Sequence, residues 1–463
     1  SNFLSNPMDC KICQYSAQQS LKLLSKGIHR IVLPNITTRY TWSYTTADEL
    51  KHIVYGNVPI GYSVLSTYIS QTRNMNPLID NSTRPFFDHL LDEAAKLVDA
   101  IDKLYQEIKP DKLCTFNGRL FESSPIVQYA IFRHIPFDIN ELIGGHGKPY
   151  YKVIFHNHIA HDIEYLTELI EDAWNKSTKS ESDRISIGNS FFENRRSGVE
   201  AGDKVYISKQ QKGLLPSDWD AQKRNIVFFN SSEDEFASVG DAYESYALFS
   251  SQLEGIKRIL ELTKDCKDIH FYVRVHPNLS NITYRYHLDL YELPKLYPHV
   301  TVIPATEKVS TYSLMEAAEK IIVFGSTMGI ESSYWGKPVI LLAGAMYYNL
   351  GVCHIPHTEQ DMLKMILDPK LPTAQCHRNQ YYKFGFYFMD TERSICSTGY
   401  EYFNYNPFEI RIGKQSFHGT YCQKFLGSSS LYAYIVAIGR KMAQILCKNQ
   451  YTLPLEEATN KSL

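Results

Sequence analysis

No charge of one sign dominates this chain of 463 residues, because 48 Lys and Arg stand against 50 Asp and Glu, a formal net charge of −2. This balance lacks the basic excess of nucleic-acid-binding proteins, so nucleic acid is not an expected partner. Long apolar runs are also missing: the most apolar stretches, 339–348 and 431–439, are about half the roughly 20 residues that cross a bilayer. The first residues lack a basic region followed by an apolar core. We therefore expect a cytoplasmic protein, with peripheral association with the inner membrane left open.

The nine cysteines form neither a disulfide framework nor a metal pattern. Cys10 and Cys13 make a CxxC pair, but no second pair follows at a zinc-binding spacing. His158 and His161 stand at helical spacing near His156, without an accompanying HExxH motif or cysteine. We therefore expect reduced thiols and no metal site.

The length exceeds that of a single hydrophobic core, so two domains are expected. A polar stretch at 175–222, rich in Ser, Lys, Asp and Gly, is typical of a junction. We place a first domain at 1–222, a second at 223–385 and an extension at 386–463. A helical pattern at about 431–447 is expected to pack back on the first domain.

The first half alternates extended apolar runs with helical patterns, which predicts a parallel sheet. Strands are expected at 28–34, 112–116 and 151–155. The clearest helix runs from Arg84 to Ile108, with apolar residues at helical spacing and Pro110 ending it. A second helix is expected from Ser123-Ser124-Pro125, with a serine cap and a proline in its first turn, to about His134.

The second half begins another alternating series, which predicts a second doubly wound α/β unit. Its strands are expected at 225–230, 270–275, 300–303, 321–324 and 339–342, and its helices at 242–262, 313–319, 329–334 and 360–366. In such sheets ligands bind at the carboxyl ends of the strands, so the residues after each strand are the candidates for a site.

Two of these strand ends carry polar residues suited to phosphate. Ser231 and Ser232 follow the first strand, where they favour a phosphate site or a plain helix cap about equally. Arg274, His276 and Pro277 follow the second strand; alternation places Arg274 and His276 on one side, and Pro277 ends the pairing. A cation and an imidazole held together there can bind a diphosphate or nucleotide phosphate.

The strongest signal is Phe324-Gly325-Ser326-Thr327-Met328-Gly329-Ile330-Glu331, where a strand runs into a short helix. We expect Ser326 and Thr327 to bind phosphate, Gly329 to let the ligand approach closely, and Glu331 to accept hydrogen bonds from ribose hydroxyls. The alternative is a purely structural turn.

The motifs Arg-x-His-Pro, Ser-Thr-x-Gly-x-Glu, Gly336-Lys337-Pro338-Val339 and 344–351 together resemble the capsule polysaccharide biosynthesis family, which includes bacterial β-Kdo transferases. The resemblance covers roughly residues 225–358, and a weaker similarity is present at residues 116–119. It implies a GT-B fold, two Rossmann-like domains facing a central cleft, with the nucleotide held by the second domain. It also implies a CMP-linked sugar donor, no cofactor and no catalytic metal, with His276, Ser326 and Thr327 at the donor phosphate. The expected activity is sugar transfer to a glycan or lipid-linked glycan in the synthesis of capsule polysaccharide or lipopolysaccharide. Association of the protein with a polysaccharide-assembly complex is left open.

Sugar transfer needs a group that deprotonates the acceptor, or a carboxylate nucleophile if the configuration is retained. Two loops of the first half, 117–122 and 138–147, offer such groups. The first candidate is Glu141, followed by Glu122, Asp138 and the glycine-flanked His146.

Two other functions fit the same pattern. One is a polyol-phosphate transferase of the teichoic-acid type that uses a CDP-linked donor, and the other is a non-catalytic GT-B module that binds a glycan or partner enzyme. For a transferase, we expect His276→Ala and Glu331→Ala to weaken donor use without unfolding the protein.

Overall fold

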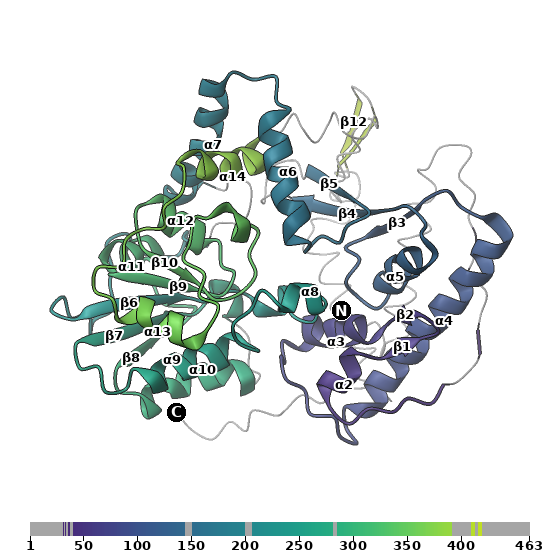
Figure 1. Cartoon of the computed structure of the whole chain (residues 1–463), viewed down its shortest axis with the longest axis horizontal. Helices are drawn as coiled ribbons and strands as arrows, with labels where there is room; N and C mark the ends of the chain where they lie inside the picture. The colour runs from purple at the N-terminus through teal and green to yellow at the C-terminus, as the bar shows by residue number, and fades with distance from the viewer. Residues whose placement is uncertain are drawn as a thin grey trace.

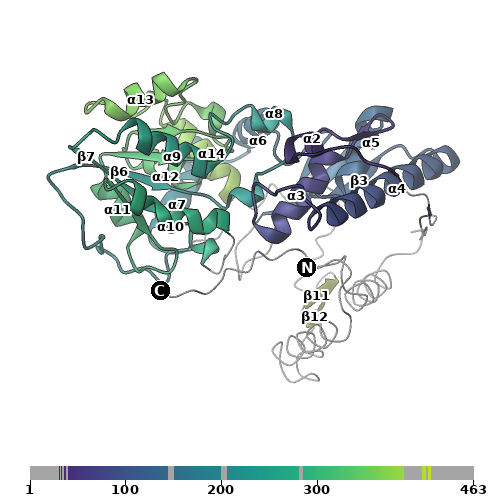
Figure 2. The same ribbon diagram turned by 90° about the horizontal axis from the view of Figure 1, so that it is seen from below.

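The computed structural model describes residues 40–143, 151–199, 206–280 and 285–390, with positions 31, 33, 36–37, 409–412 and 415–418. Most of the strand predicted at 28–34, the helix predicted at 431–447, the CxxC pair and His146 lie outside these residues. The described chain forms two α/β units side by side, with helix α8 (Asp241–Glu244) at their junction in both views (Figures 1 and 2).

The first unit packs helices around a small sheet whose described strands run in the order β3-β4-β5. In chain order its elements are α2 (Ala47–Lys51), β1 (Val54–Tyr55), β2 (Val58–Pro59), α3 (Gly61–Thr72), α4 (Arg84–Ile108), β3 (Leu113–Phe116), α5 (Ser124–Arg133), β4 (Phe137–Ile143) and β5 (Tyr151–His156). Strand β4 is parallel to β3 but antiparallel to β5. The predicted strands at 112–116 and 151–155 are confirmed, but the expectation of an all-parallel sheet is wrong for this unit.

Helix α4 has the predicted bounds because its sequence signals agree. Leu90, Leu91, Ala94 and Ile101 recur on one face and are buried in the core of the first unit. Helix α5 also starts as predicted, but Ser123 donates its hydroxyl to the Leu120 carbonyl and makes no side-chain cap. The proline in the first turn therefore marks this helix start better than the serine does.

The second unit contains a five-stranded, fully parallel sheet with the strand order β10-β9-β6-β7-β8. Its elements are β6 (Arg224–Phe229), η1 (Glu233–Glu235), α8, α9 (Gln252–Leu262), β7 (Ile269–Arg274), η2 (Pro277–Leu279), α10 (Arg285–Leu296), β8 (Val300–Ile303), α11 (Thr311–Ala317), β9 (Lys320–Val323), α12 (Met328–Tyr334), β10 (Val339–Leu341), η3 (Tyr348–Leu350) and α13 (Glu359–Leu367). All five predicted strands are confirmed. Counted from β6, this is the 3-2-1-4-5 order of a Rossmann half, so the predicted doubly wound unit is confirmed.

The single helix expected at 242–262 is wrong, because α8 and α9 are separated by a segment of turns and bends at 245–251. Leu248 donates its backbone N–H to the Leu342 carbonyl at 2.9 Å, which ties this segment to the loop after β10. Ser251 then caps α9 by accepting from the Glu254 backbone N–H. The interruption leaves α8 free to contact the first unit.

Three helices pack beside the second sheet: α6 (Ile163–Asn175), α7 (Glu181–Arg196) and α14 (Asn379–Met389) (Figure 1). Helix α7 lies inside the polar stretch expected to be a junction, yet its Phe191 and Phe192 are buried in the core of the second unit. Glycines let α7 and α14 touch: a Cβ at Gly188 would lie 2.2 Å from the Tyr382 carbonyl oxygen. The boundaries at 222 and 385 stay predictions.

Two further described strands, β11 (Glu409–Ile412) and β12 (Gln415–His418), pair antiparallel. Within the described ranges, no helix is both long enough and apolar enough to span a membrane.

Candidate functional site

The strand order of the second unit places its topological switch point between β6 and β9, where ligands of open α/β sheets bind. The chain leaves β6 at Asn230 and β9 at Phe324. Ser231 donates its hydroxyl to the Phe324 carbonyl at 3.0 Å, which joins the two loops. The predicted serine loop and the predicted Ser326-Thr327 turn therefore meet at this crevice.

The loop after β7 is held against the loop after β6 by two hydrogen bonds. The His276 backbone N–H donates to Asn230 Oδ1 at 2.6 Å, and the Asn278 side-chain amide donates to Ser232 Oγ at 3.2 Å. The structure therefore brings Ser231, Ser232 and His276 together, as their strand-end positions predict. Pro277 opens the short helix η2 beside them.

His276 is held as a neutral hydrogen-bond donor. Its Nδ1 accepts from the Asn278 backbone N–H at 3.2 Å, which assigns the ring proton to Nε2. Burial, with a smaller effect from nearby Arg274, lowers the pKa of His276 to about 4. The ring packs edge-on against Tyr206, with centroids 4.9 Å apart. At neutral pH this imidazole can donate one hydrogen bond without carrying a charge.

Arg274 does not have the role expected for it. Its side chain is 2% exposed, and its guanidinium donates to the Pro304 carbonyl and, at 3.1 Å, to the Glu307 carbonyl. A group so buried offers almost no surface to a ligand, so the prediction of direct phosphate contact is corrected. Arg274 instead fixes the loop after β8.

The turn after β9 is tightly packed. Gly325 has φ +91, a conformation that L side chains rarely adopt, and Ser326 accepts at its carbonyl from the Tyr347 hydroxyl. A Cβ at Gly329 would lie 2.2 Å from that hydroxyl. Gly329 therefore makes room for Tyr347, which corrects the expectation that it makes room for a ligand.

Glu331 is also directed away from the crevice. It is 1% exposed, and its two carboxylate oxygens accept from Arg195 Nε at 3.0 Å and from the Tyr312 hydroxyl at 2.5 Å. Because both oxygens are occupied and buried, the expected contact with ribose hydroxyls is corrected. Glu331 joins α12 to α7 and α11.

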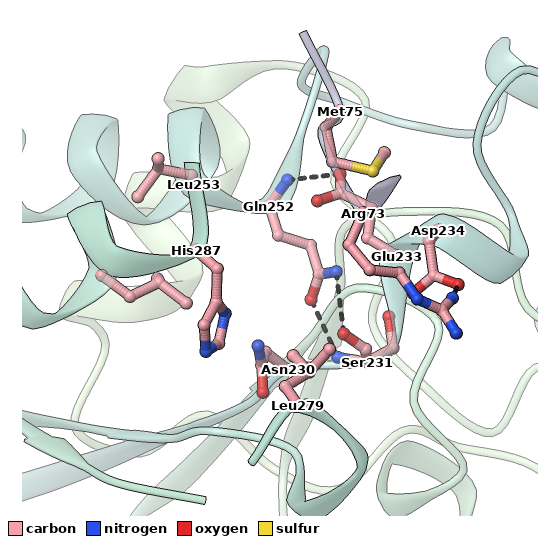
Figure 3. A pocket seen from close by; sticks show the side chains of 11 residues that line it. Arg73, Met75, Asn230, Ser231, Glu233, Asp234, Gln252, Leu253, Leu279 and His287 are labelled. Carbon is pink, nitrogen blue, oxygen red and sulfur yellow. Dashed lines mark hydrogen bonds and ion pairs between the residues drawn. The ribbon is translucent and has the colours of Figure 1, made fainter. Parts of the chain in front are cut away.

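Gln252, the first residue of α9, organises the loop after β6 (Figure 3). Its side-chain oxygen accepts from the Ser231 N–H at 2.9 Å, its side-chain amide donates to the Ser231 carbonyl, and its own N–H donates to Glu233 Oε1 at 2.8 Å. Beside it, Arg73 of the first unit forms an ion pair with Asp234. The small cavity among these groups, about 30 Å³, is large enough for roughly one water molecule.

A larger cavity of about 340 Å³ lies between the two units at the same strand ends. The first unit contributes Lys51, Leu65, Ile69 and Met75 to its lining. The second unit contributes the aromatic side chains Phe236, Tyr243, Phe249 and Phe324. It also contributes the polar residues Ser231, Glu233, Ser238, Glu244, Ser250, Ser251 and Gln252. Among the described lining residues the one cation is Lys51, which is paired with Glu244 at 2.9 Å. Hydroxyls and aromatic faces without a spare positive charge suit an uncharged, hydroxyl-rich group such as a sugar or nucleoside.

The first-unit candidates for acceptor chemistry lie in different places. Glu141 lies on strand β4, not in a loop as expected, and accepts from the Asn117 side chain at 2.6 Å. Glu122 is solvent-exposed, and partial desolvation raises the pKa of its carboxyl. Asp138 lies at the opposite end of β4, bound to Lys112 at 3.1 Å and His156 at 2.7 Å, which removes it from the crevice.

Two residues not proposed for catalysis line the junction between the units. Arg119, which follows β3, donates to the Asp234 carbonyl at 2.9 Å and to Ser70 Oγ at 2.9 Å. His161 lies against Phe236 and Tyr243, and burial, followed by the charge of Arg119, lowers its pKa to about 4. The Asn-Gly-Arg motif after a strand was a signal for Arg119, whereas nothing in the sequence places His161 at the junction.

The described residues contain no group of three or more His, Cys, Asp or Glu arranged to hold a metal ion. His156 and His158 instead pair with Asp138 and Asp162, each at 2.7 Å. The described cysteines Cys114, Cys266, Cys353 and Cys376 are free thiols. These arrangements satisfy the histidines within the protein.

The two lowered histidine pKa values predict acid sensitivity of the fold. The unfolded chain binds more protons than the native chain between about pH 6.5 and about pH 4, so stability is full above this window and falls as the pH decreases through it. Each histidine contributes at most about 1.4 kcal/mol per pH unit, because each ring binds at most one proton more in the unfolded chain than in the native chain.

Urea unfolding at about pH 7, 6 and 5 measures this dependence. His161→Gln should lower the slope of stability against pH between these values. A slope unchanged by the substitution would refute the assignment for His161.

Two α/β units with a crevice at the carboxyl edge of a Rossmann half define a protein of the GT-B class. Residues 240–381 match the family model described as capsule polysaccharide biosynthesis protein. This confirms, for that part of the chain, the resemblance carried by the Arg-x-His-Pro and Ser-Thr-x-Gly-x-Glu motifs.

Several solved structures are similar in fold. One is Thermosulfurimonas dismutans KpsC, a β-Kdo 2,4 transferase, at 13% identity over 58% of this chain and 77% of that chain, with a TM-score of 0.36. Another is the KpsC β-Kdo 2,7 transferase of the same organism, at 15% identity over 62% and 79%, with a TM-score of 0.35. A third is UDP-GlcNAc 2-epimerase from Neisseria meningitidis, at 15% identity over 66% and 81%, with a TM-score of 0.32. Among curated protein sequences, none is similar enough to count as a match.

Proposed function

We propose that this protein transfers a sugar from a nucleotide-linked donor to a glycan or lipid-linked glycan, in the synthesis of a bacterial capsule or related surface polysaccharide. The observation that carries the proposal is the meeting of the loops after β6, β7 and β9 at the switch point, beside a cavity walled by both units. The family match at 240–381 supports the same pathway class.

In this proposal the donor phosphate lies at the loops and the uncharged part of the donor lies in the cavity. His276 donates from Nε2 to a phosphate oxygen, and the Ser326-Thr327 turn supplies further donors. Among its described lining residues the cavity has no spare cation, so it takes an uncharged part of the donor: the nucleoside, or a sugar that carries no carboxylate. A CMP-linked donor such as CMP-Kdo is the first to test.

Glu141 is the proposed catalytic carboxylate. In a direct displacement it accepts the proton of the acceptor hydroxyl, while that oxygen bonds to the anomeric carbon and the nucleotide leaves with the electron pair of the broken carbon–oxygen bond. If the configuration is retained through a covalent intermediate, the same carboxylate attacks the anomeric carbon. Asn117, bonded to Glu141 at 2.6 Å, fixes its orientation in either case. No metal is proposed, so activity should persist in the presence of a chelator.

Thermal-shift measurements with CMP, CDP, UDP and GDP test nucleotide binding, because a ligand that binds only the native state raises the melting temperature. We expect a shift with at least one nucleotide, and CMP first among them. A donor screen follows: turnover of CDP-glycerol but of no sugar nucleotide would establish the polyol-phosphate transferase instead. No shift with any of the four nucleotides would favour the non-catalytic module and contradict the proposal.

A further inference from the structure

Arg195 is a buried cation that no sequence motif marks and that lies outside the family match at 240–381. It comes from the last turn of α7 and is 6% exposed. Its Nε donates to Glu331 Oε1 at 3.0 Å, and its terminal nitrogen Nη2 donates to Thr327 Oγ1 at 3.3 Å. One planar guanidinium thus holds two residues of the turn and helix that follow β9.

The contact with Thr327 decides what the threonine hydroxyl can do. Thr327 precedes α12, and its side chain makes no capping hydrogen bond to the helix. Because its oxygen accepts from Arg195, its own proton remains available for donation. Thr327 is also partly exposed, unlike Glu331. The hydroxyl can therefore donate to a ligand that reaches this turn.

Stability alone does not account for this arrangement. A buried ion pair adds little net stability over apolar residues of similar size. The same sheet contains a second, more exposed Arg–Glu pair at its amino edge, where Arg224 donates to Glu319 through Nε at 3.0 Å and through Nη2 at 2.9 Å. That pair holds no hydroxyl-bearing turn at a strand's carboxyl end, so it provides a comparison.

We propose that Arg195 is a positioning residue for the donor phosphate. It does not contact the donor itself but fixes the side chain of Thr327, so that the threonine hydroxyl donates a hydrogen bond to a phosphate oxygen. This inference rests on the proposed function, because it assumes that a nucleotide binds at the Ser326-Thr327 turn. A lysine cannot replace Arg195, since one ammonium group lacks the planar fork that reaches Glu331 and Thr327 together.

Isothermal titration calorimetry with CMP, or with whichever of the four nucleotides the wild type binds, tests the proposal on the full chain. Arg195→Lys and Thr327→Val should each weaken the Kd about tenfold, the effect of losing one hydrogen bond to a charged group. Thr327→Ser keeps the hydroxyl and should restore the wild-type Kd. The control Arg224→Lys should lower the melting temperature by less than Arg195→Lys does, because its ion pair is more exposed, and should change the Kd by less than about twofold.

Wild-type affinity in Arg195→Lys would overturn the inference, even if Thr327→Val were weakened, because the threonine would then act without Arg195. Equal weakening by Arg224→Lys would also overturn it, since the effect would be one of general stability. If Arg195→Lys does not fold, the double variant Arg195→Met with Glu331→Leu takes its place, because it removes both buried charges together. A wild type that binds none of the four nucleotides refutes the proposed function and this inference with it, an outcome distinct from a wild type that binds and variants that match it.

Discussion

Glu331→Ala is expected to destabilise the protein by about 3–5 kcal/mol, because it leaves the guanidinium of Arg195 buried without its carboxylate. The Tyr312 hydroxyl loses its acceptor as well. This corrects the expectation from the sequence that the substitution weakens donor use while leaving the fold intact. Urea unfolding measures the free energy difference.

The control for this prediction is one residue further along α7, where Arg196 pairs with Glu316 at the surface. Glu316 is 49% exposed, so Glu316→Ala should cost less than about 1 kcal/mol. If Glu331→Ala were as mild as Glu316→Ala, the account of Glu331 as a buried connection between α7, α11 and α12 would be wrong.

Glu141→Gln is expected to lower kcat by about 10²–10⁴-fold, the usual contribution of a positioned general base. The amide keeps the size of the side chain, and its oxygen can still accept from Asn117. Folding and nucleotide binding should therefore be unchanged. Steady-state transfer assays give kcat, and thermal-shift measurements without and with the nucleotide check folding and nucleotide binding.

Glu122→Gln provides the comparison, because Glu122 is a second carboxyl of the first unit, exposed at its surface, whose pKa is raised by partial desolvation. We expect a much smaller change in kcat. Loss of turnover in Glu122→Gln together with wild-type turnover in Glu141→Gln would move the catalytic role to Glu122.

The second sheet and helix α4 could be predicted from the sequence because several local signals agree there. Buried parallel strands are short apolar runs, and the predicted bounds of β6 to β10 all agree with the structure within about two residues. The sequence interpretation predicts a loop where strand β4 lies, although Phe137 and Ile139 are buried and alternate with polar Asp138 and Asn140. That alternation was an available signal for a strand.

The candidate site was predictable only at the level of loops. Chain topology brings Ser231, Ser232, His276 and the Ser326-Thr327 turn together, and strand ends can be read from the sequence. Side-chain partners cannot be read this way. Alternation gives the side of a strand on which Arg274 lies but not that two carbonyls after β8 accept from it.

The hydrogen-bond partner of Glu331 also could not be predicted from the sequence, because the two residues are far apart along the chain. Its partner Arg195 is 136 residues away, in a polar stretch that reads as a linker. Helix α7 has weak amphipathic character, so only its tertiary contacts through Phe191, Phe192 and Gly188 reveal it as part of the second core.

The most direct test of the account is a crystal structure of the protein with CMP bound. We predict a phosphate oxygen within hydrogen-bond distance of His276 Nε2 and of the Thr327 hydroxyl, with the remainder of the nucleotide entering the cavity between the units. A nucleotide bound elsewhere, with His276 and Thr327 free of contact to it, would contradict the central claim.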